Sequence, residues 1–323
     1  MHLMSLGFAV FFGIFAQHTV AQSYPSKSVR IIVPFPPGGP TDVVARLVTT
    51  KLNEALGQFF VIENHGGATG TIGSALAAKS PPDGYTLIMH STSSYISKFL
   101  YRNVSYEPAR DFAPIINCAT FPFLLTVHRS VPVKSVAELI AFARKHPGQL
   151  AYSSPGAGSA GQLVTEMFRS AAGLDLVHVP YKGAAPAAVA LSGGEVSLAF
   201  DSVSTAKLHV QQGRLRTLAV TTAKRTPLAP DMPTLQESGI PGFEAYIWFG
   251  MFGMFGLSGT PPALLARLNA EIGKILASAE MHDRLLAIGA EFTPNTPEQF
   301  ASFIAEDVPK WHKVIIDTGV RVD

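Results

Sequence analysis

Short apolar runs and stretches with helical spacing alternate along this chain. The first run, residues 29–33, is rich in β-branched side chains and ends in a turn of prolines and glycines. The pattern predicts a strand, a tight turn and then a helix that begins at the capping pair Thr41-Asp42. One face of that helix is expected to carry the apolar residues Val43, Val44, Leu47, Val48 and Leu52.

The same succession recurs over the rest of the chain. Ser135 and Glu138 have the spacing of a capping box at one helix start. Because strands and helices alternate, we expect an α/β fold of mostly parallel sheets with helices on both faces. Further strands are expected at residues 59–63, 85–89, 121–127, 150–154, 176–179, 196–200, 215–220 and 243–252. Further helices are expected at residues 70–79, 135–146, 184–191, 261–277, 281–288 and 297–316, with one after residue 161 and one ending near residue 212.

Two glycine-rich turns stand between an expected strand and an expected helix, one in each half of the chain. The first contains Pro36, Pro37, Gly38 and Gly39, and the second covers residues 155–161. Glycine lets the backbone approach a ligand, and a helix N-terminus presents free N–H groups, so each turn suits an anion. The first turn has no Lys, Arg or Cys. This favours reversible capture of a small carboxylate over chemistry performed on it.

Composition narrows the classes of partner and site. The chain has 323 residues, 47% of them hydrophobic, which is enough for two lobes with sizeable cores. The net charge is +2 and no Lys/Arg cluster occurs, which argues against a nucleic-acid partner. The single cysteine, Cys118, excludes an intrachain disulfide and multi-cysteine metal sites. We expect it to be a small buried residue and not a catalytic thiol.

The N-terminus has the features of an export signal. Residues 3–15 form an apolar run too short to span a bilayer, and small residues precede a cleavage position after Ala21. We therefore expect residues 1–21 to be a signal peptide, although its first residues lack Lys and Arg. No later stretch is a convincing membrane span, and the mature protein is expected to be exported and soluble.

Several motifs fit either a functional role or a simpler structural one. Residues 156–161 fit G-x-G-x-x-G, but Asp175 precedes an apolar run, whereas a ribose-binding acid ends the second strand. The chain has no H-E-x-x-H or G-x-S-x-G pattern, so nothing points to a metal, a cofactor or an activated serine. Asp201 ends an expected strand and either meets a ligand amine, fixes a hinge or caps the next helix. Lys182 either meets a carboxylate or is solvated.

Over nearly the whole mature chain, the sequence resembles the periplasmic solute receptors of tripartite tricarboxylate transporters, which are called Bug proteins. The matching segments are Tyr24-Pro25-Ser26-Lys27, Pro34-Phe35-Pro36-Pro37-Gly38-Gly39 with Asp42, Glu63-Asn64, Asp83-Gly84-Tyr85-Thr86-Leu87, Val179-Pro180-Tyr181-Lys182-Gly183, Gly213-Arg214-Leu215-Arg216, Pro233-Thr234-Leu235-Gln236-Glu237, Trp248 and Gly259-Thr260-Pro261-Pro262.

The resemblance implies an α/β, two-lobed periplasmic binding protein of the Venus-flytrap, type II-like class. Lobe 1 is expected at residues 22–123 and 222–323, and lobe 2 at residues 124–221, with two crossing segments as the hinge. Such a receptor binds a small carboxylate between the lobes and delivers it to a membrane permease. It is expected to be a monomer without cofactor or metal, and not an enzyme. The alternatives are a receptor that presents ligand to a signalling kinase and, less favoured, an exported hydrolase.

The resemblance also implies where the ligand is held. In such receptors the first-loop backbone and waters hold a carboxylate, and polar side chains from both lobes select the ligand. The residues implied here are Pro36, Pro37, Gly38, Gly39, Asn64, Thr92, Ser93, Ser154, Gly156, Ala157, Gly158, Ser159 and Asp201. Three departures concern ligand identity: Gln162 replaces a common histidine, His65-Gly66-Gly67 replaces a basic-Pro-Gly run, and a second Met-Phe-Gly follows Met251-Phe252-Gly253.

Overall fold

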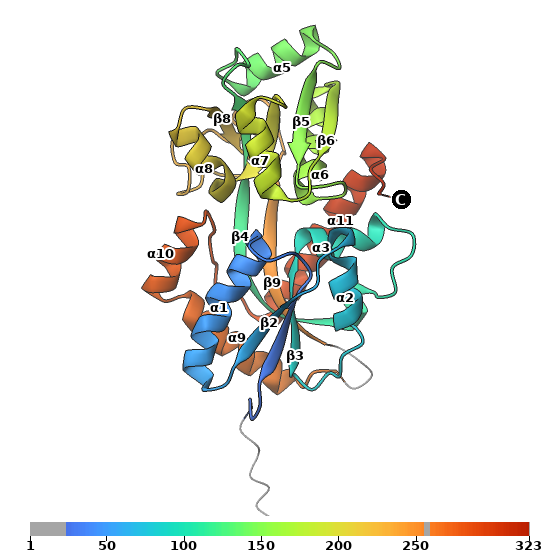
Figure 1. Ribbon diagram of the computed structural model, residues 1–323, viewed down its shortest axis with the longest axis vertical. Coiled ribbons are helices and arrows are strands. Elements are labelled where there is room, and N and C mark those ends of the chain that lie inside the picture. The colour runs from blue at the N-terminus through green and yellow to red at the C-terminus, as the bar shows by residue number, and fades with distance from the viewer. Residues whose placement is uncertain (1–23, 255–258, 323) are drawn as a thin grey trace, which may run out of the picture.

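One strand, β4 (Phe112–His128), runs through both halves of the molecule (Figure 1). Its first part pairs antiparallel with β9 (Tyr246–Met254), and its second part pairs antiparallel with β7 (Leu198–Ser202) and β8 (Leu215–Val220). A single nine-stranded sheet results, in the order β2-β1-β3-β9-β4-β7-β5-β6, with β8 on β4. The computed structural model describes residues 24–254 and 259–322, so the predicted signal peptide and Phe255-Gly256 lie outside the described residues.

The lower lobe in Figure 1 contains the parallel strands β1 (Val29–Val33), β2 (Phe60–Asn64) and β3 (Thr86–Ser91). Its main core joins Ile31 of β1 with Val44 of α1 (Pro40–Leu56) and Leu268 of α9 (Pro262–Leu276). The second face of the sheet packs Ile32 against Ala77 and Phe300. These last two residues belong to α2 (Thr71–Ala77) and α11 (Pro297–Thr318). The remaining helices here are α3 (Thr92–Ile96), α4 (Pro108–Asp111) and α10 (Ala279–Ala287), with 3-10 turns at Ala68–Gly70 and Ser97–Phe99.

The upper lobe is built on the parallel strands β5 (Leu150–Ser154), β6 (Leu176–Pro180) and β7. Its core packs Tyr152, Leu163 and Phe200 with residues of α5 and α6. The helices of this lobe are α5 (Val136–Lys145), α6 (Ala160–Ala172), α7 (Ala184–Gly193) and α8 (Val203–Gln211). Helices cover both faces of the sheet, as alternating strand and helix signals predict.

Two segments carry the chain between the lobes, β4 on the way up and β9 on the way back (Figure 1), since Leu235, Phe243 and Ala245 before β9 still pack in the upper-lobe core. Thr221 joins β4 to the residue before β9, because its hydroxyl oxygen accepts the N–H of Phe123 at 3.0 Å and its hydroxyl donates to the carbonyl of Ala245 at 2.6 Å. The residue limits of the two lobes stay a prediction. Within residues 24–254 and 259–322, no helix is both long and apolar enough to cross a bilayer.

Local details differ from the sequence expectations in three places. The strand expected at 121–127 extends from Phe112 to His128 and pairs antiparallel with β7, β8 and β9, so the sheet is mixed and the expectation of mostly parallel sheets is wrong. Helix α1 begins at Pro40, with Gly39 and not Thr41-Asp42 at its cap. Ser135 caps α5, but the Glu138 carboxylate accepts the N–H of Lys134 instead of that of Ser135.

Cys118 is fully buried, as expected, and burial raises the pKa of its thiol to about 12.

Candidate ligand-binding site

The first glycine turn leads from β1 into a helix start that has no side-chain cap. Gly38 has a φ of 81°, in the left-handed region that glycine adopts readily, whereas Gly39 is extended with a φ of −77°. No side chain caps α1, and Pro40 at its first position has no N–H to satisfy. The next N–H groups, of Thr41 and Asp42, point out of the helix start and suit an anion.

The carboxylate of Asp42 sits at this same helix start, but its charge is neutralised. Arg46 donates to it at 2.8 and 3.0 Å, Gly38 N–H at 2.9 Å and the Asn64 amide at 2.9 Å. Burial acts to raise the pKa of Asp42, but these hydrogen bonds outweigh it and hold the pKa below its usual value. Asn64 also donates to the carbonyl of Phe35 at 3.0 Å. The amide that is predicted to face the ligand therefore also stabilises the turn.

The predicted residues of α3 hold other elements in place. The hydroxyl oxygen of Thr92 accepts the N–H of Trp248 in β9 at 3.0 Å. The hydroxyl oxygen of Ser93 accepts the N–H of Ala160 at 3.1 Å. Ala160 is the first residue of α6 in the upper lobe. Thr92 and Ser93 are both buried. Ser93 is therefore a direct link between the lobes.

The second glycine turn satisfies much of its own backbone. Ser159 caps α6 by accepting the N–H of Gln162, and the Gln162 side-chain oxygen accepts the N–H of Gly158 at 2.7 Å. The carbonyl of Ala157 accepts a hydrogen bond from Thr69 at 3.4 Å across the lobes. Gln162 is thus tied into the turn itself.

Ser154, before this turn, lies 2.7 Å from His178 Nε2 and 3.0 Å from the Gly156 carbonyl. The His178 ring stacks on Tyr152, and burial lowers the pKa of His178. A serine and a histidine in contact raise the question of an activated nucleophile. Ser154 is only 1% exposed, however, and in the described part of the chain no carboxylate is hydrogen-bonded to the His178 ring.

Asp201 lies at the carboxyl end of β7 and is almost completely buried. Its carboxylate accepts a hydrogen bond from Thr126 at 3.0 Å, and burial raises its pKa to about 6. The next helix is capped by Ser202, so the role of helix cap considered for Asp201 is wrong. Lys182, in the turn before α7, is exposed.

The structure brings all five of the predicted segments together. Gly66 lies against Pro36, and Gly70 lies against Phe35 and Ser94, so the turns after β1, β2 and β3 are neighbours. Ser93 and Thr69 then reach the second glycine turn. Asp201 follows Phe200, whose carbonyl lies beside Gly161 at the start of α6. The segments form one region between the lobes.

Sequence reasoning missed Arg46, Thr69 and His178. Arg46 lies four residues after Asp42 in the same helix, a spacing that predicts an ion pair. Thr69 and His178 acquire their partners only when distant segments of the chain meet. Among the described residues no cluster of histidine, cysteine and carboxylate side chains is arranged to hold a metal.

The comparisons with known proteins identify the family. Residues 44–320 match the family described as "Tripartite tricarboxylate transporter family receptor", TctC. The chain belongs to this family. Protein BugT of Bordetella pertussis is 35% identical over 304 residues, which cover 94% of this chain and 92% of BugT.

Solved structures of the same family have the same fold. The R. palustris protein Rpa4515 with adipate has a TM-score of 0.84 and 39% identity, and the match covers 92% of this chain and 99% of that one. MatC from Rhodopseudomonas palustris with bound malate has a TM-score of 0.81 and 31% identity, with 90% and 100% covered. The two-lobed periplasmic binding fold is therefore confirmed.

Members of the TctC family are periplasmic solute-binding receptors and not enzymes. This chain is accordingly a solute receptor of the TctC/Bug type, and the hydrolase alternative is wrong.

Proposed function

We propose that this receptor binds a small carboxylate, with dicarboxylates as the first class to test, in the region between its lobes. The single observation that carries the proposal is the uncapped start of α1, whose own acid, Asp42, is neutralised by Arg46 and Asn64. An anion there meets backbone N–H groups and a helix dipole without facing an unpaired negative charge. The adipate and malate bound to two relatives support the dicarboxylate class.

Delivery of the ligand to a membrane permease is the second part of the proposal, and it is supported by the transporter family to which the chain belongs. Presentation to a signalling kinase is the alternative role. A pull-down of the ligand-loaded receptor separates the two, because it recovers either permease subunits or a kinase sensor domain. Export by residues 1–21 stays a prediction, and the mass of the exported protein checks it.

The binding proposal is tested by thermal unfolding of the mature protein with a panel of mono-, di- and tricarboxylates and amino acids. A ligand that binds only the folded chain stabilises it by about 2.7 kcal/mol at 100 times its Kd. We expect at least one small carboxylate to raise the melting temperature, in a manner that depends on its concentration.

The matched control is the amide or alcohol of the same carbon skeleton, which lacks the anionic group. Stabilisation by the control to the same extent would show that the carboxylate is not what the protein recognises. If no carboxylate in the panel shifts the transition, the proposal fails.

A further inference from the structure

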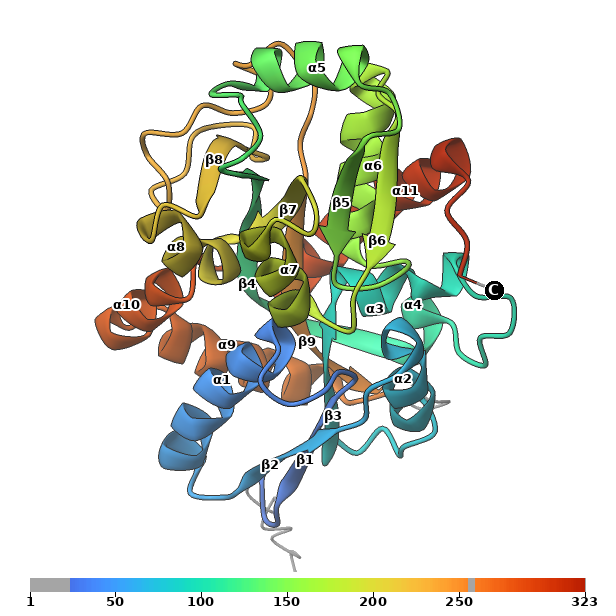
Figure 2. The same ribbon diagram turned by 45° about the horizontal axis from the view of Figure 1, so that its top comes forward.

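Helix α11 contributes to the cores of both lobes. Near its start, Phe300 and Ile304 pack with Trp248 and Phe252 in the lower lobe. Near its end, Trp311 and Ile315 belong to the core of the upper lobe. Figure 2 shows this end beside α6, and the helix also contacts α3 and β4. The helix is thus a third connection between the lobes, beyond the two crossing segments predicted from the sequence.

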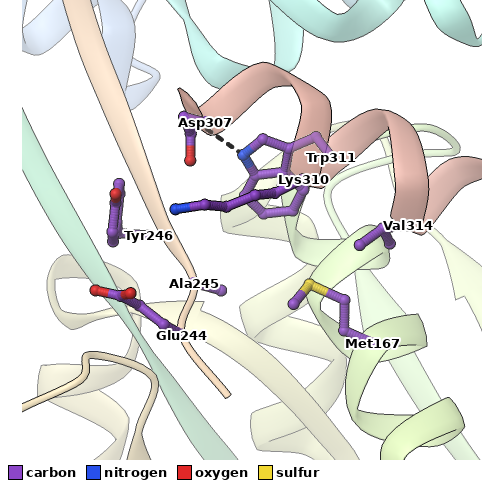
Figure 3. A pocket seen from close by; sticks show the side chains of 8 residues that line it. All are labelled: Met167, Glu244, Ala245, Tyr246, Asp307, Lys310, Trp311 and Val314. Carbon is purple, nitrogen blue, oxygen red and sulfur yellow. Dashed lines mark hydrogen bonds between the residues drawn. The ribbon is translucent and has the colours of Figure 1, made fainter. Parts of the chain in front are cut away.

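The middle of α11 is fixed to the sheet by one buried carboxylate. Asp307 Oδ2 accepts the indole N–H of Trp248 from β9 at 2.9 Å. The same oxygen accepts the indole N–H of Trp311, one turn further along the helix, at 3.0 Å (Figure 3). Asp307 is only 5% exposed. One oxygen atom therefore holds together a hinge-side strand of the lower lobe and the tryptophan that enters the upper core.

The same part of α11 contains a proline, which weakens the hydrogen bonding of the helix. Pro309 lies inside α11, two residues after Asp307 and two before Trp311. Proline has no N–H to donate to the carbonyl of Ala305, and its ring crowds that carbonyl. Kinks and bends in helices concentrate at such positions. The most easily bent point of α11 thus lies between its two core contacts.

A cavity beside this point is lined from both lobes. Figure 3 shows Lys310 extending across it toward Tyr246 and Glu244, with Met167 of α6 on the other side. The cavity holds only about 20 Å³, roughly the room of one water molecule, so it is a small packing defect beside Lys310.

We propose that α11 is a flexible strap that sets how far the lobes separate, with Asp307 as its clamp and Pro309 as its bending point. The clamp holds the helix on β9 and so favours the arrangement in which Ser93 meets Ala160. Bending at Pro309 allows the upper lobe to move away. This inference concerns motion without ligand, so it stands or fails separately from carboxylate binding.

The test measures the distance between spin labels on the two lobes in the ligand-free, mature protein. Cysteines introduced at the exposed Thr50 of α1 and Lys207 of α8 carry the labels, and native Cys118 is fully buried and does not compete. We expect Asp307→Ala to broaden the distance distribution toward longer values. Pro309→Ala restores the missing N–H and is expected to narrow the distribution around the shorter distances.

Asp307→Asn is the matched control, since its amide oxygen can accept both indole N–H groups, and we expect it to stay close to the wild type. The proposal is overturned if Asp307→Ala and Pro309→Ala both leave the distribution unchanged. It is also overturned if Asp307→Asn broadens it as much as Asp307→Ala, because lost charge and not the clamp would then be responsible. Should Asp307→Ala fail to fold, Pro309→Ala still decides, since an unchanged distribution contradicts the bending point.

Discussion

Asp42 and Asp201 are both buried carboxyl groups beside the predicted site, but their surroundings shift their pKa values in opposite directions. Asp42 has a guanidinium, an amide and a backbone N–H as donors, and these hold its pKa below the usual value despite burial. Asp201 has the Thr126 hydroxyl as its donor, and burial raises its pKa to about 6. The number of donors decides which effect wins.

Replacing Asp201 by Asn is expected to change how stability depends on pH. A carboxyl with a raised pKa contributes stability that is complete below the unfolded value near 3.8 and is lost as pH rises through about 6. Relative to Asp201→Asn, the wild type should therefore lose about 2 kcal/mol of unfolding free energy between pH 4 and pH 7. Urea denaturation of both proteins at several pH values measures this difference. A constant difference across the range would contradict the raised pKa.

The same variant tests ligand selection. If Asp201 faces the ligand, its negative charge at neutral pH attracts an ammonium and repels a second carboxylate. We predict that Asp201→Asn shifts the preference from glutamate toward glutarate by about 1–3 kcal/mol, the scale of leaving a charged group unpaired. Calorimetric affinities of both proteins for the two ligands measure the ratio. An unchanged ratio would remove Asp201 from the site.

At the scale of one element, the two glycines of the turn before α1 have different backbone conformations and different roles. Gly38 adopts the positive φ that the chain reversal needs, whereas Gly39 has an ordinary extended φ and marks the helix start. A Cβ atom on Gly39 would meet only the carbonyl oxygen of Pro36, at an ordinary 3.7 Å. A Cβ atom at position 39 therefore does not crowd the turn, and we expect the effect of a substitution there to fall on the ligand.

Gly39→Val is accordingly expected to fold normally and to bind carboxylate at least tenfold more weakly, which is about 1.4 kcal/mol. The branched side chain stands where an anion approaches the N–H groups of α1. Calorimetry gives the affinity and thermal unfolding gives the stability. Gly193→Val, at an open position in α7, is the control for the substitution itself. Equal affinity in a folded Gly39→Val protein would refute the assignment of this turn to the site.

At the scale of the whole molecule, hydrogen bonds between the lobes stabilise the arrangement seen here. Ser93 accepts the N–H of Ala160, and Thr69 donates to the carbonyl of Ala157. The first bond joins α3 of the lower lobe to the start of α6, and the second joins the 3-10 turn at Ala68–Gly70 to the glycine turn before α6. They stabilise the contact of the lobes without any ligand, and a ligand that contacts both lobes adds to the same preference.

Ser93→Ala is predicted to shift the ligand-free protein toward a more open form. The loss of one hydrogen bond of about 1 kcal/mol changes the ratio of open to closed molecules roughly fivefold. Small-angle X-ray scattering without ligand should give a larger radius of gyration than that of the wild type. Ser130→Ala, an exposed serine of the upper lobe, serves as the control. A radius identical in all three proteins would mean that the Ser93 bond does not hold the lobes together.

The sequence by itself determined the order of strands and helices and the position of both glycine turns, because these depend on local spacing. Apolar side chains at strand or helix period define each element, and proline and glycine restrict the backbone between elements. The turn and the helix start that follows it were therefore predictable from residues 34–42 alone, and anion binding there stays a prediction. Even the partnership of Arg46 with Asp42 follows from a spacing of four residues.

Only the tertiary structure decided which polar groups of the site are already occupied. Asn64, Thr92, Ser93 and Gln162 all have protein partners here. Except for the bond of Gln162 to its own loop, those partners come from segments far away in the sequence. Local patterns contain no information on such contacts, since they depend on how strands from different parts of the chain meet.

The tertiary structure also decided that β4 runs antiparallel through both lobes and that α11 belongs to two cores. The sequence of α11 shows one apolar face, with Phe300, Ile304, Trp311 and Ile315 at helical spacing. Nothing in that spacing distinguishes a face that packs against one core from a face that passes from one core to another. That distinction arises from the position of the helix across the sheet, which is fixed by long-range packing and by the Asp307 carboxylate.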